Sequence, residues 1–216
     1  MQEPILLTLI VPIYGRPKGT RNLIMDVTNQ TLDGWELILV SDACPHFEEV
    51  IVRQDVRSSI DSAMQRGNRV VIHRFAQRQG GYGHAGFNYG IDHAKGVYLI
   101  FAGNDDRISP FHFENYLRPM ALDPHLDLCF FPSLVATPSA MYVRRPELRF
   151  GGVGHSELVV RTELARRVGG HETSYGHDWT FIESMLEICK KSRIDDLGMP
   201  TYVVRHLGAD GETEVY

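Results

Sequence analysis

A cluster of polar side chains follows one apolar segment and carries the most readable chemistry in the sequence. Asn104, Asp105 and Asp106 come shortly after segment 97–102, whose length and residue types are those of a buried strand. The carboxyl ends of such strands form the ligand-binding edge of open α/β sheets. Adjacent carboxylates repel each other unless a cation lies between them, and their oxygen atoms suit Mg²⁺ or Mn²⁺. We therefore expect a divalent metal site here, with an acidic turn before a helix as the alternative.

Similar segments along the chain predict the sheet that positions these acids. Short apolar segments alternate with segments of helical spacing, which favours an α/β fold with a mainly parallel central sheet, right-handed crossovers and helices on both faces. The expected strands are 5–11, ending at Pro12, and then 36–40, 69–73, 97–102, 126–131 and 201–205. The expected helices are 20–29, 47–65, 84–94, 111–122, 158–168 and 178–191, and segment 132–154 is expected to be irregular.

Composition limits the class of protein. The 216 residues suffice for one sizeable core, so we expect a single domain over residues 1–216. A net charge of -5, without a long basic run, argues against nucleic-acid partners. Three widely spaced cysteines indicate a reducing compartment, the cytoplasm. The apolar run near the N-terminus is too short for a membrane span and lacks the flanks of a signal peptide, so we expect no transmembrane segment.

Four motifs in order resemble the inverting nucleotide-sugar glycosyltransferases of the GT-A fold, the glycosyltransferase family 2 type. The first strand ends in Val-Pro-Ile-Tyr at residues 11–14, and the second ends in Ser41 and Asp42. A glycine-rich segment with Gly80, Gly81, Ala85, Asn88 and Gly90 precedes the central strand. The metal-binding Asp-x-Asp signature falls on Gly103, Asn104 and Asp105. The resemblance covers roughly residues 5 to 190.

This chain departs from the family pattern at three places. Ser41 replaces the first of two acids, and Gly103 replaces the first acid of the metal signature. The arginine that the family carries in the glycine-rich segment is not obvious. The second acid of each pair is retained as Asp42 and Asp105, so the resemblance still implies a nucleotide site and a metal site.

The resemblance implies a separate role for each candidate residue. Asp42 would accept the imide N–H of uracil or thymine, and Pro12 and Tyr14 would begin the cradle for the base and ribose. Arg16 and His84 would help to neutralise the pyrophosphate, Gly81 would let the backbone approach it, and Asn104 would bind a ribose hydroxyl. Asp105, Asp106 and His206 would hold Mn²⁺ or Mg²⁺. An ordinary turn aspartate and a surface histidine remain the alternatives for Asp42 and His206.

The expected reaction transfers a sugar from a nucleotide-sugar donor, with UDP as the expected nucleotide, to a hydroxyl group of a glycan or other acceptor. Inverting transfer needs one base to deprotonate the acceptor hydroxyl. The family places this base at the start of a late helix, which makes Asp178 the candidate here; a helix N-cap is its alternative role. A non-catalytic sugar-nucleotide or glycan-binding domain and a nucleotidyltransferase are the competing functions. The turn at residues 14–17 is poor in glycine, which disfavours the nucleotidyltransferase.

Overall fold

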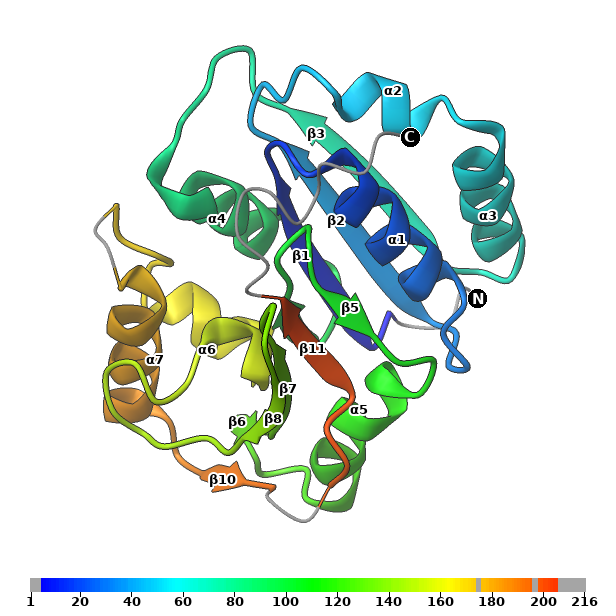
Figure 1. Cartoon of the computed structure of the whole chain (residues 1–216). Coiled ribbons are helices and arrows are strands. Elements are labelled where there is room, and N and C mark those ends of the chain that lie inside the picture. Colours follow the sequence, from blue (N-terminus) through cyan, green and yellow to red (C-terminus); the bar gives the residue numbers. More distant parts are fainter. Residues whose placement is uncertain (1–4, 174–175, 196–197, 206–216) are drawn as a thin grey trace.

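A twisted sheet with helices on both faces forms the centre of the molecule (Figure 1). The computed structural model describes residues 5–173, 176–195 and 198–205. Within them, seven strands pair in the order β10-β6-β9-β4-β1-β2-β3. These strands are β1 (Leu7–Ile13), β2 (Trp35–Ser41), β3 (Arg69–Arg74), β4 (Tyr98–Phe101), β6 (Leu128–Phe130), β9 (Leu158–Arg161) and β10 (Ser192–Ile194).

Parallel pairing dominates the half of this sheet that comes first in the chain. Strand β1 pairs in parallel with both β2 and β4, and β2 pairs in parallel with β3. The carboxyl ends of β1, β2 and β4 therefore meet at one edge, as the sequence predicts. The expected mainly parallel α/β sheet is confirmed.

Helices cover both faces of the sheet because side chains along each strand alternate between two cores. Leu9 and Val11 of β1 lie in one core, and Ile10 lies in the other. The first core also contains side chains of α1 (Pro17–Thr28), α2 (Phe47–Ile51), α3 (Gln54–Gln65) and α5 (His112–Leu122). The second contains side chains of α4 (His84–His93), α6 (Thr162–Arg167) and α7 (His177–Ile188).

A second, four-stranded sheet takes two of its strands from segment 132–154, which the sequence predicts to be irregular, and a third from the strand predicted over 201–205. Its order is β5-β11-β7-β8, with β5 (Arg107–Ile108), β7 (Ser133–Ala136), β8 (Met141–Arg144) and β11 (Tyr202–Arg205). Strand β11 pairs with β5 and β7. The prediction of an irregular segment 132–154 is thus wrong over β7 and β8, whose short strands have too few residues to show a clear alternation.

Strand β9 corrects the helix predicted over residues 158–168. Leu158, Val159 and Val160 are fully buried and pair antiparallel with β4 on one side and β6 on the other. A fully buried strand has no polar face, so its apolar run cannot be told from a buried helix by spacing alone. Only the residues from Thr162 onward are helical, as α6.

Two other boundaries differ from the prediction. Helix 47–65 divides into α2 and α3 because Arg53 adopts an extended conformation, with φ −58° and ψ 135°. Strand β1 continues through Pro12 to Ile13. Its pairing with β4 covers only Leu7 to Ile10, so the proline, which lacks an N–H, lies past the end of that ladder.

A buried carboxylate links three segments at the end of the sheet opposite the acidic turn. Glu36 of β2 accepts hydrogen bonds from Thr8 Oγ1 at 2.7 Å and from the Lys95 backbone N–H at 2.8 Å, and it pairs with Arg69. Its side chain is inaccessible to solvent, so these partners compensate for the loss of hydration. Glu36 thereby fixes the entry to β4, the strand that leads to Asp105.

Among the described helices, none combines the length and the apolar character needed to cross a lipid bilayer. Cys44, Cys129 and Cys189 are all free thiols, in agreement with their spacing in the sequence.

Candidate active site

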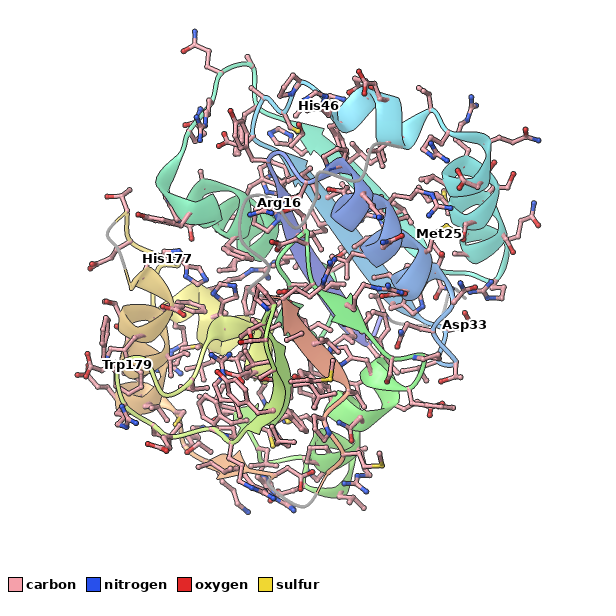
Figure 2. All side chains as sticks on the ribbon, viewed as in Figure 1. Arg16, Met25, Asp33, His46, His177 and Trp179 are labelled. Atoms are coloured by element: carbon pink, nitrogen blue, oxygen red, sulfur yellow. The ribbon has the colours of Figure 1, made fainter. Side chains whose placement is uncertain are left out.

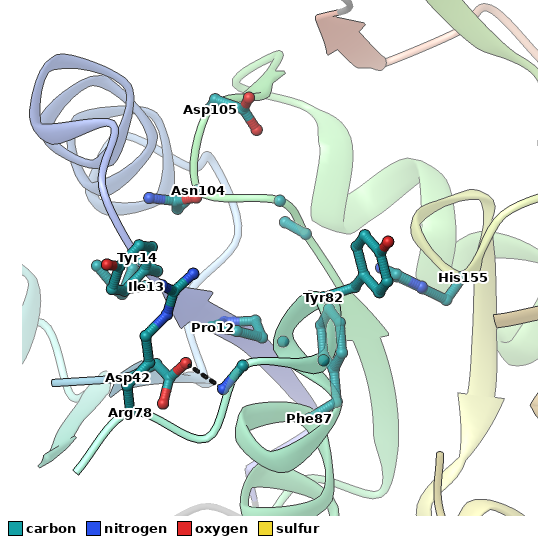
Figure 3. A pocket seen from close by; sticks show the side chains of 15 residues that line it. Pro12, Ile13, Tyr14, Asp42, Arg78, Tyr82, Phe87, Asn104, Asp105 and His155 are labelled. Carbon is teal, nitrogen blue, oxygen red and sulfur yellow. Dashed lines mark hydrogen bonds between the residues drawn. The ribbon is translucent and has the colours of Figure 1, made fainter. Parts of the chain in front are cut away.

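A pocket of about 610 Å³ opens at the carboxyl ends of β1, β2 and β4 (Figure 3). This volume lies in the range of small-molecule sites. Its described lining comes from residues 12–14, 42, 78, 80–83, 87, 102–105 and 155. The structure therefore brings six of the predicted nucleotide and metal residues together in one cavity: Pro12, Tyr14, Asp42, Gly81, Asn104 and Asp105.

The two adjacent acids of the turn have different surroundings. Asp105 lines the pocket, its side chain is 30% exposed, and Arg16 Nε lies 3.8 Å from its Oδ2. Asp106 is buried below the turn, where Oδ2 accepts a hydrogen bond from Tyr202 Oη at 2.6 Å and Oδ1 accepts one from the Arg205 N–H at 2.8 Å. Only Asp105 presents its carboxylate to the pocket.

The carboxyl group of Asp106 has a raised pKa, mainly because it is buried. Burial and, to a smaller extent, the nearby charge of Asp105 raise the pKa of this carboxyl to about 7, although the hydrogen bond from Tyr202 opposes the increase. Asp106 is thus a structural support of the turn in this arrangement. His206, the third expected metal ligand, lies outside the described residues; Arg205, which precedes it, contacts both Asp105 and Asp106.

The donor atoms at the turn suit an ion that takes most of its ligands from substrate and water. Among the described residues, no group of three histidine, cysteine, aspartate or glutamate side chains surrounds a common point. The carboxylate of Asp105 is nevertheless available at the pocket wall. Mg²⁺ and Mn²⁺ are commonly held by one or two carboxylates together with substrate phosphates, so the residues present fit such an ion.

Asp42 fixes the glycine-rich loop in front of α4. Its Oδ1 accepts the Gln79 N–H at 2.5 Å and its Oδ2 accepts the Gly80 N–H at 2.9 Å. Gly80 has φ 71° and ψ −145°, a conformation open essentially to glycine. Each carboxylate oxygen has a second lone pair, so Asp42 can hold the loop and still accept a hydrogen bond from a ligand in the pocket.

The glycine-rich loop packs closely on the end of β1. A Cβ atom on Gly83 would lie 3.0 Å from Pro12 Cβ, and one on Gly86 would lie 2.9 Å from the same atom. The start of α4 can therefore approach Pro12 only because both residues are glycine. The His84 ring turns to the Gly81 carbonyl, with Nδ1 2.7 Å from that oxygen, and His84 is not among the described residues that line the pocket.

Asn104 connects the acidic turn to the start of α1. Its Nδ2 donates to the Gly15 carbonyl at 3.2 Å and to Thr20 Oγ1 at 2.9 Å. The amide nitrogen thus holds the loop that carries Arg16, whose φ of 50° is unusual for a residue other than glycine. Only the amide nitrogen takes part in these hydrogen bonds, so the amide oxygen remains available to a ligand.

Arg78 is a pocket residue that the sequence analysis missed. Its guanidinium carbon lies 3.9 Å from the centre of the Tyr14 ring, and both side chains line the pocket near Asp42 (Figure 3). The contact is a cation–π interaction at close range. A basic residue directly before a glycine-rich run was the available signal.

Asp178 lies beyond the opposite end of the pocket. It is in the first turn of α7, where its Oδ1 accepts the Trp179 N–H at 2.9 Å, and the described pocket lining does not include it. Its neighbour His177 lies at the end of α7 nearest α4 (Figure 2), with its ring 6.0 Å from that of His155. His155 lines the pocket, whereas Asp178 does not. His155, Tyr82 and Phe87 were also missed, and no spacing in the sequence singles them out.

Comparison with known proteins agrees with the fold. The model of the family "Glycosyl transferase family 2" matches residues 8–179. The chain is 32% identical over 113 residues to the minor teichoic acid biosynthesis protein GgaB of Bacillus subtilis, covering 51% of this chain and 11% of that protein. It is 24% identical over 199 residues to an uncharacterized glycosyltransferase of Haemophilus influenzae, covering 84% of this chain and 62% of that protein. The chain thus spans less than two thirds of the length of these relatives.

Solved structures share the architecture at low sequence identity. S. aureus TarS 1-349 in complex with UDP has a TM-score of 0.74 and 14% identity, covering 93% of this chain and 60% of that one. The mannosyltransferase PcManGT from Pyrobaculum calidifontis, in complex with GDP-Man and Mn²⁺, has a TM-score of 0.64 and 17% identity, covering 98% of this chain and 59% of that one. These likenesses support the GT-A fold that the motifs imply. With a family match over most of its length and a pocket built from the family's own motifs, the chain belongs to glycosyltransferase family 2.

Proposed function

We propose that the chain transfers a sugar, with inversion, from a nucleoside diphosphate sugar to a hydroxyl group of a glycan or other acceptor, and that UDP is the preferred nucleotide. The observation that carries the proposal is the shared pocket of Asp42 and Asp105, which places a hydrogen-bond acceptor for a nucleobase and a ligand for a divalent cation in one cavity. Solved structures of the same fold contain UDP and UDP-GlcNAc, which supports uridine as the base.

In the proposed mechanism, each part of the donor has its own contact. Asp42 accepts the imide N–H of the base, Asn104 binds the ribose and Arg16 approaches the diphosphate beside Asp105. Asp105 would hold Mn²⁺ or Mg²⁺, and such an ion would supply positive charge to stabilise the departing diphosphate. Asp178 accepts the proton of the acceptor hydroxyl as that oxygen attacks the anomeric carbon.

A non-catalytic sugar-nucleotide-binding domain is the second candidate function. The observation that favours it is the position of Asp178 outside the described lining of the pocket. The two functions differ in turnover: a binding domain retains the nucleotide site but neither transfers nor hydrolyses the sugar.

The test begins with calorimetric titration of UDP, dTDP and GDP in Mn²⁺, in Mg²⁺ and with chelator. We expect UDP to bind most tightly and chelator to weaken it sharply, while Asp105→Ala binds UDP in Mn²⁺ no better than the wild type does with chelator. Exposed Asp61 of α3 supplies the control Asp61→Ala.

Release of UDP from UDP-sugars then separates an enzyme from a binding domain, and NMR of the product determines the anomeric configuration. Metal-independent binding by both the wild type and Asp105→Ala would contradict the metal assignment.

A further inference from the structure

The pocket has a second end, opposite Asp42, that none of the roles above uses. Two residues line this end: Tyr82 from the turn Gly81–Gly83 and His155 from the turn His155–Glu157 (Figure 3). Phe87 lies beneath them, with its ring centre 4.4 Å from that of His155. Two turns far apart in the sequence thus place an aromatic ring and an imidazole at the same end of the cavity.

Tyr82 is held in an unusual way. Its φ of 56° and ψ of 24° place a bulky residue in the left-handed region, between two glycines that also have positive φ. Its side chain is 73% exposed, although it belongs to the pocket wall. Residues held in such sparsely populated conformations cluster at active sites and ligand-binding segments.

His155 is a polar group without a hydrogen-bond partner among the described residues, and its Nδ1 is fully covered. The ring is fixed by aromatic contacts with Phe87 and with Phe101, whose centre lies 5.9 Å away. Burial keeps the pKa of His155 well below its usual value, so the imidazole is neutral near pH 7 and offers one donor and one acceptor.

Hydrogen bonds to the Glu157 side chain fix the backbone around His155. The Gly154 N–H donates to Glu157 Oε2 at 2.8 Å, and Arg144 Nε donates to Glu157 Oε1 at 2.8 Å. Glu157 is completely buried, so this turn is held by a charged network that resists movement. His155 is therefore part of a rigid wall, and because its Nδ1 is covered, the ring edge that carries Nε2 is the one that a ligand in the pocket can contact.

We propose that Tyr82 and His155 form the subsite for the sugar of the donor, and that His155 is its specificity-determining residue. The inference rests on the proposed function, because the ligand is a hexopyranose attached to a nucleoside diphosphate. The apolar face of the pyranose stacks on the Tyr82 ring, and one hydroxyl of the sugar forms a hydrogen bond with the neutral imidazole of His155. A site that must hydrogen-bond one hydroxyl discriminates strongly against donors that lack it or orient it differently.

The location of this subsite agrees with the order of the donor's parts. Asp42 and Asp105 occupy the remainder of the pocket, where the base and diphosphate are expected. On the other side of His155, a Cβ atom on Gly154 would lie 3.6 Å from Asp178 Oδ2. A sugar at Tyr82 and His155 therefore lies between the metal ligand and the candidate base.

The test compares nucleotide and nucleotide-sugar affinities in variants of His155. His155→Phe keeps the aromatic packing and removes both nitrogens, whereas His155→Gln retains a donor and an acceptor. His73→Phe is the matched control, because His73 is also a partly buried histidine, stacked on Tyr89 at 3.7 Å and outside the described pocket lining. Calorimetry in Mn²⁺ measures UDP, UDP-glucose, UDP-galactose, UDP-GlcNAc and UDP-GalNAc, and thermal melting confirms that each variant folds.

We expect His155→Phe to bind UDP as the wild type does and to bind the preferred UDP-sugar about tenfold more weakly. Its preference between sugars that differ at one hydroxyl should shrink by a similar factor, and His155→Gln should recover part of both losses. Tyr82→Ala should weaken UDP-sugar binding more than UDP binding, and Tyr82→Phe should retain it.

The outcomes separate this inference from the proposed function. Wild-type protein that binds UDP in a metal-dependent way, with sugar affinity and preference unchanged in His155→Phe, overturns the sugar subsite alone. Wild-type protein that binds none of the nucleotides overturns both. If neither His155 variant folds, Tyr82→Ala decides: equal effects on UDP and on UDP-sugar contradict the subsite.

Discussion

Tyr202 Oη donates a hydrogen bond of 2.6 Å to Asp106 Oδ2, which joins the last described strand to the acidic turn after β4. The same hydroxyl accepts the Gly103 N–H at 3.1 Å. Both residues are buried, so the contact fixes the backbone on either side of Asp105. The position of the expected metal ligand thus depends on a residue almost a hundred positions later in the chain.

Tyr202→Phe should therefore destabilise the protein and weaken its nucleotide site. The variant removes the hydrogen-bond partner of the Gly103 N–H and of Asp106 Oδ2, which costs about 1–3 kcal/mol in the free energy of unfolding. We expect urea denaturation at neutral pH to show this loss and calorimetry to show weaker binding of UDP in Mn²⁺. Tyr142→Phe is the control, since Tyr142 is 52% exposed on β8 and should stay within about 0.5 kcal/mol of the wild type. Unchanged stability in Tyr202→Phe would contradict the structural role of this hydroxyl.

Asp42→Ala should reduce nucleotide affinity without removing its metal dependence. The change deletes the acceptor for the nucleobase and releases the N–H groups of Gln79 and Gly80. Losing hydrogen bonds to a charged group predicts a decrease of about 10- to 100-fold in the affinity for UDP. Calorimetry with Mn²⁺ and with chelator measures both properties, with Asp61→Ala as the control. Equal affinities in Asp42→Ala and the wild type would show that Asp42 does not contact the nucleotide.

Stability should fall as the pH decreases below 6.5, in part because of His112. Burial lowers the pKa of this histidine to about 3, whereas the unfolded chain titrates near 6.5. Between these values the unfolded state binds the proton and the folded state does not, so protonation favours unfolding by roughly 2 kcal/mol at pH 5.

The measurement is urea denaturation of the wild type and of His112→Gln between pH 7.5 and 5. Glutamine does not titrate, so the variant should lose less stability than the wild type over this range, whatever its stability at pH 7.5. His46→Gln, at an exposed histidine, should retain the wild-type slope. Parallel curves for His112→Gln and the wild type would contradict the assignment.

The strands of the nucleotide half could be predicted because their local and tertiary preferences agree. Segments such as 37–40 are apolar, bounded by the polar residues Glu36 and Ser41, and buried on both sides, so their sequence and their final environment coincide. The acids that follow them then fall at one sheet edge for reasons of topology. This is why Asp42 and Asp105 could be placed in one pocket before the structure was known.

The rest of the site depends on contacts between distant segments. Nothing next to Asp106 indicates that Tyr202 and Arg205 would occupy its oxygens, and Arg78 reaches Tyr14 only through the shape of the glycine-rich loop. Strand β9 was mistaken for part of a helix because burial on both sides removes the alternation that identifies strands. That error also concealed His155, which directly precedes β9 in the turn His155–Glu157.

Asp178→Asn should separate the base from a helix cap. Asparagine retains an oxygen that can accept the Trp179 N–H, so the first turn of α7 keeps this hydrogen bond while the side chain loses its basicity. Since a general base acts in the transition state, we expect UDP-sugar affinity and melting temperature to stay near the wild type and turnover to fall by roughly two to four orders of magnitude.

Glu183→Gln provides the control for Asp178→Asn, because it removes the same charge from an exposed position of the same helix and should leave turnover unchanged. Donor affinity, melting temperature and single-turnover rate are measured on each variant. If Asp178 acts only as a helix cap, Asp178→Ala should instead have a lower melting temperature and keep its activity per folded molecule. Near-normal turnover in folded Asp178→Asn would remove Asp178 as the base.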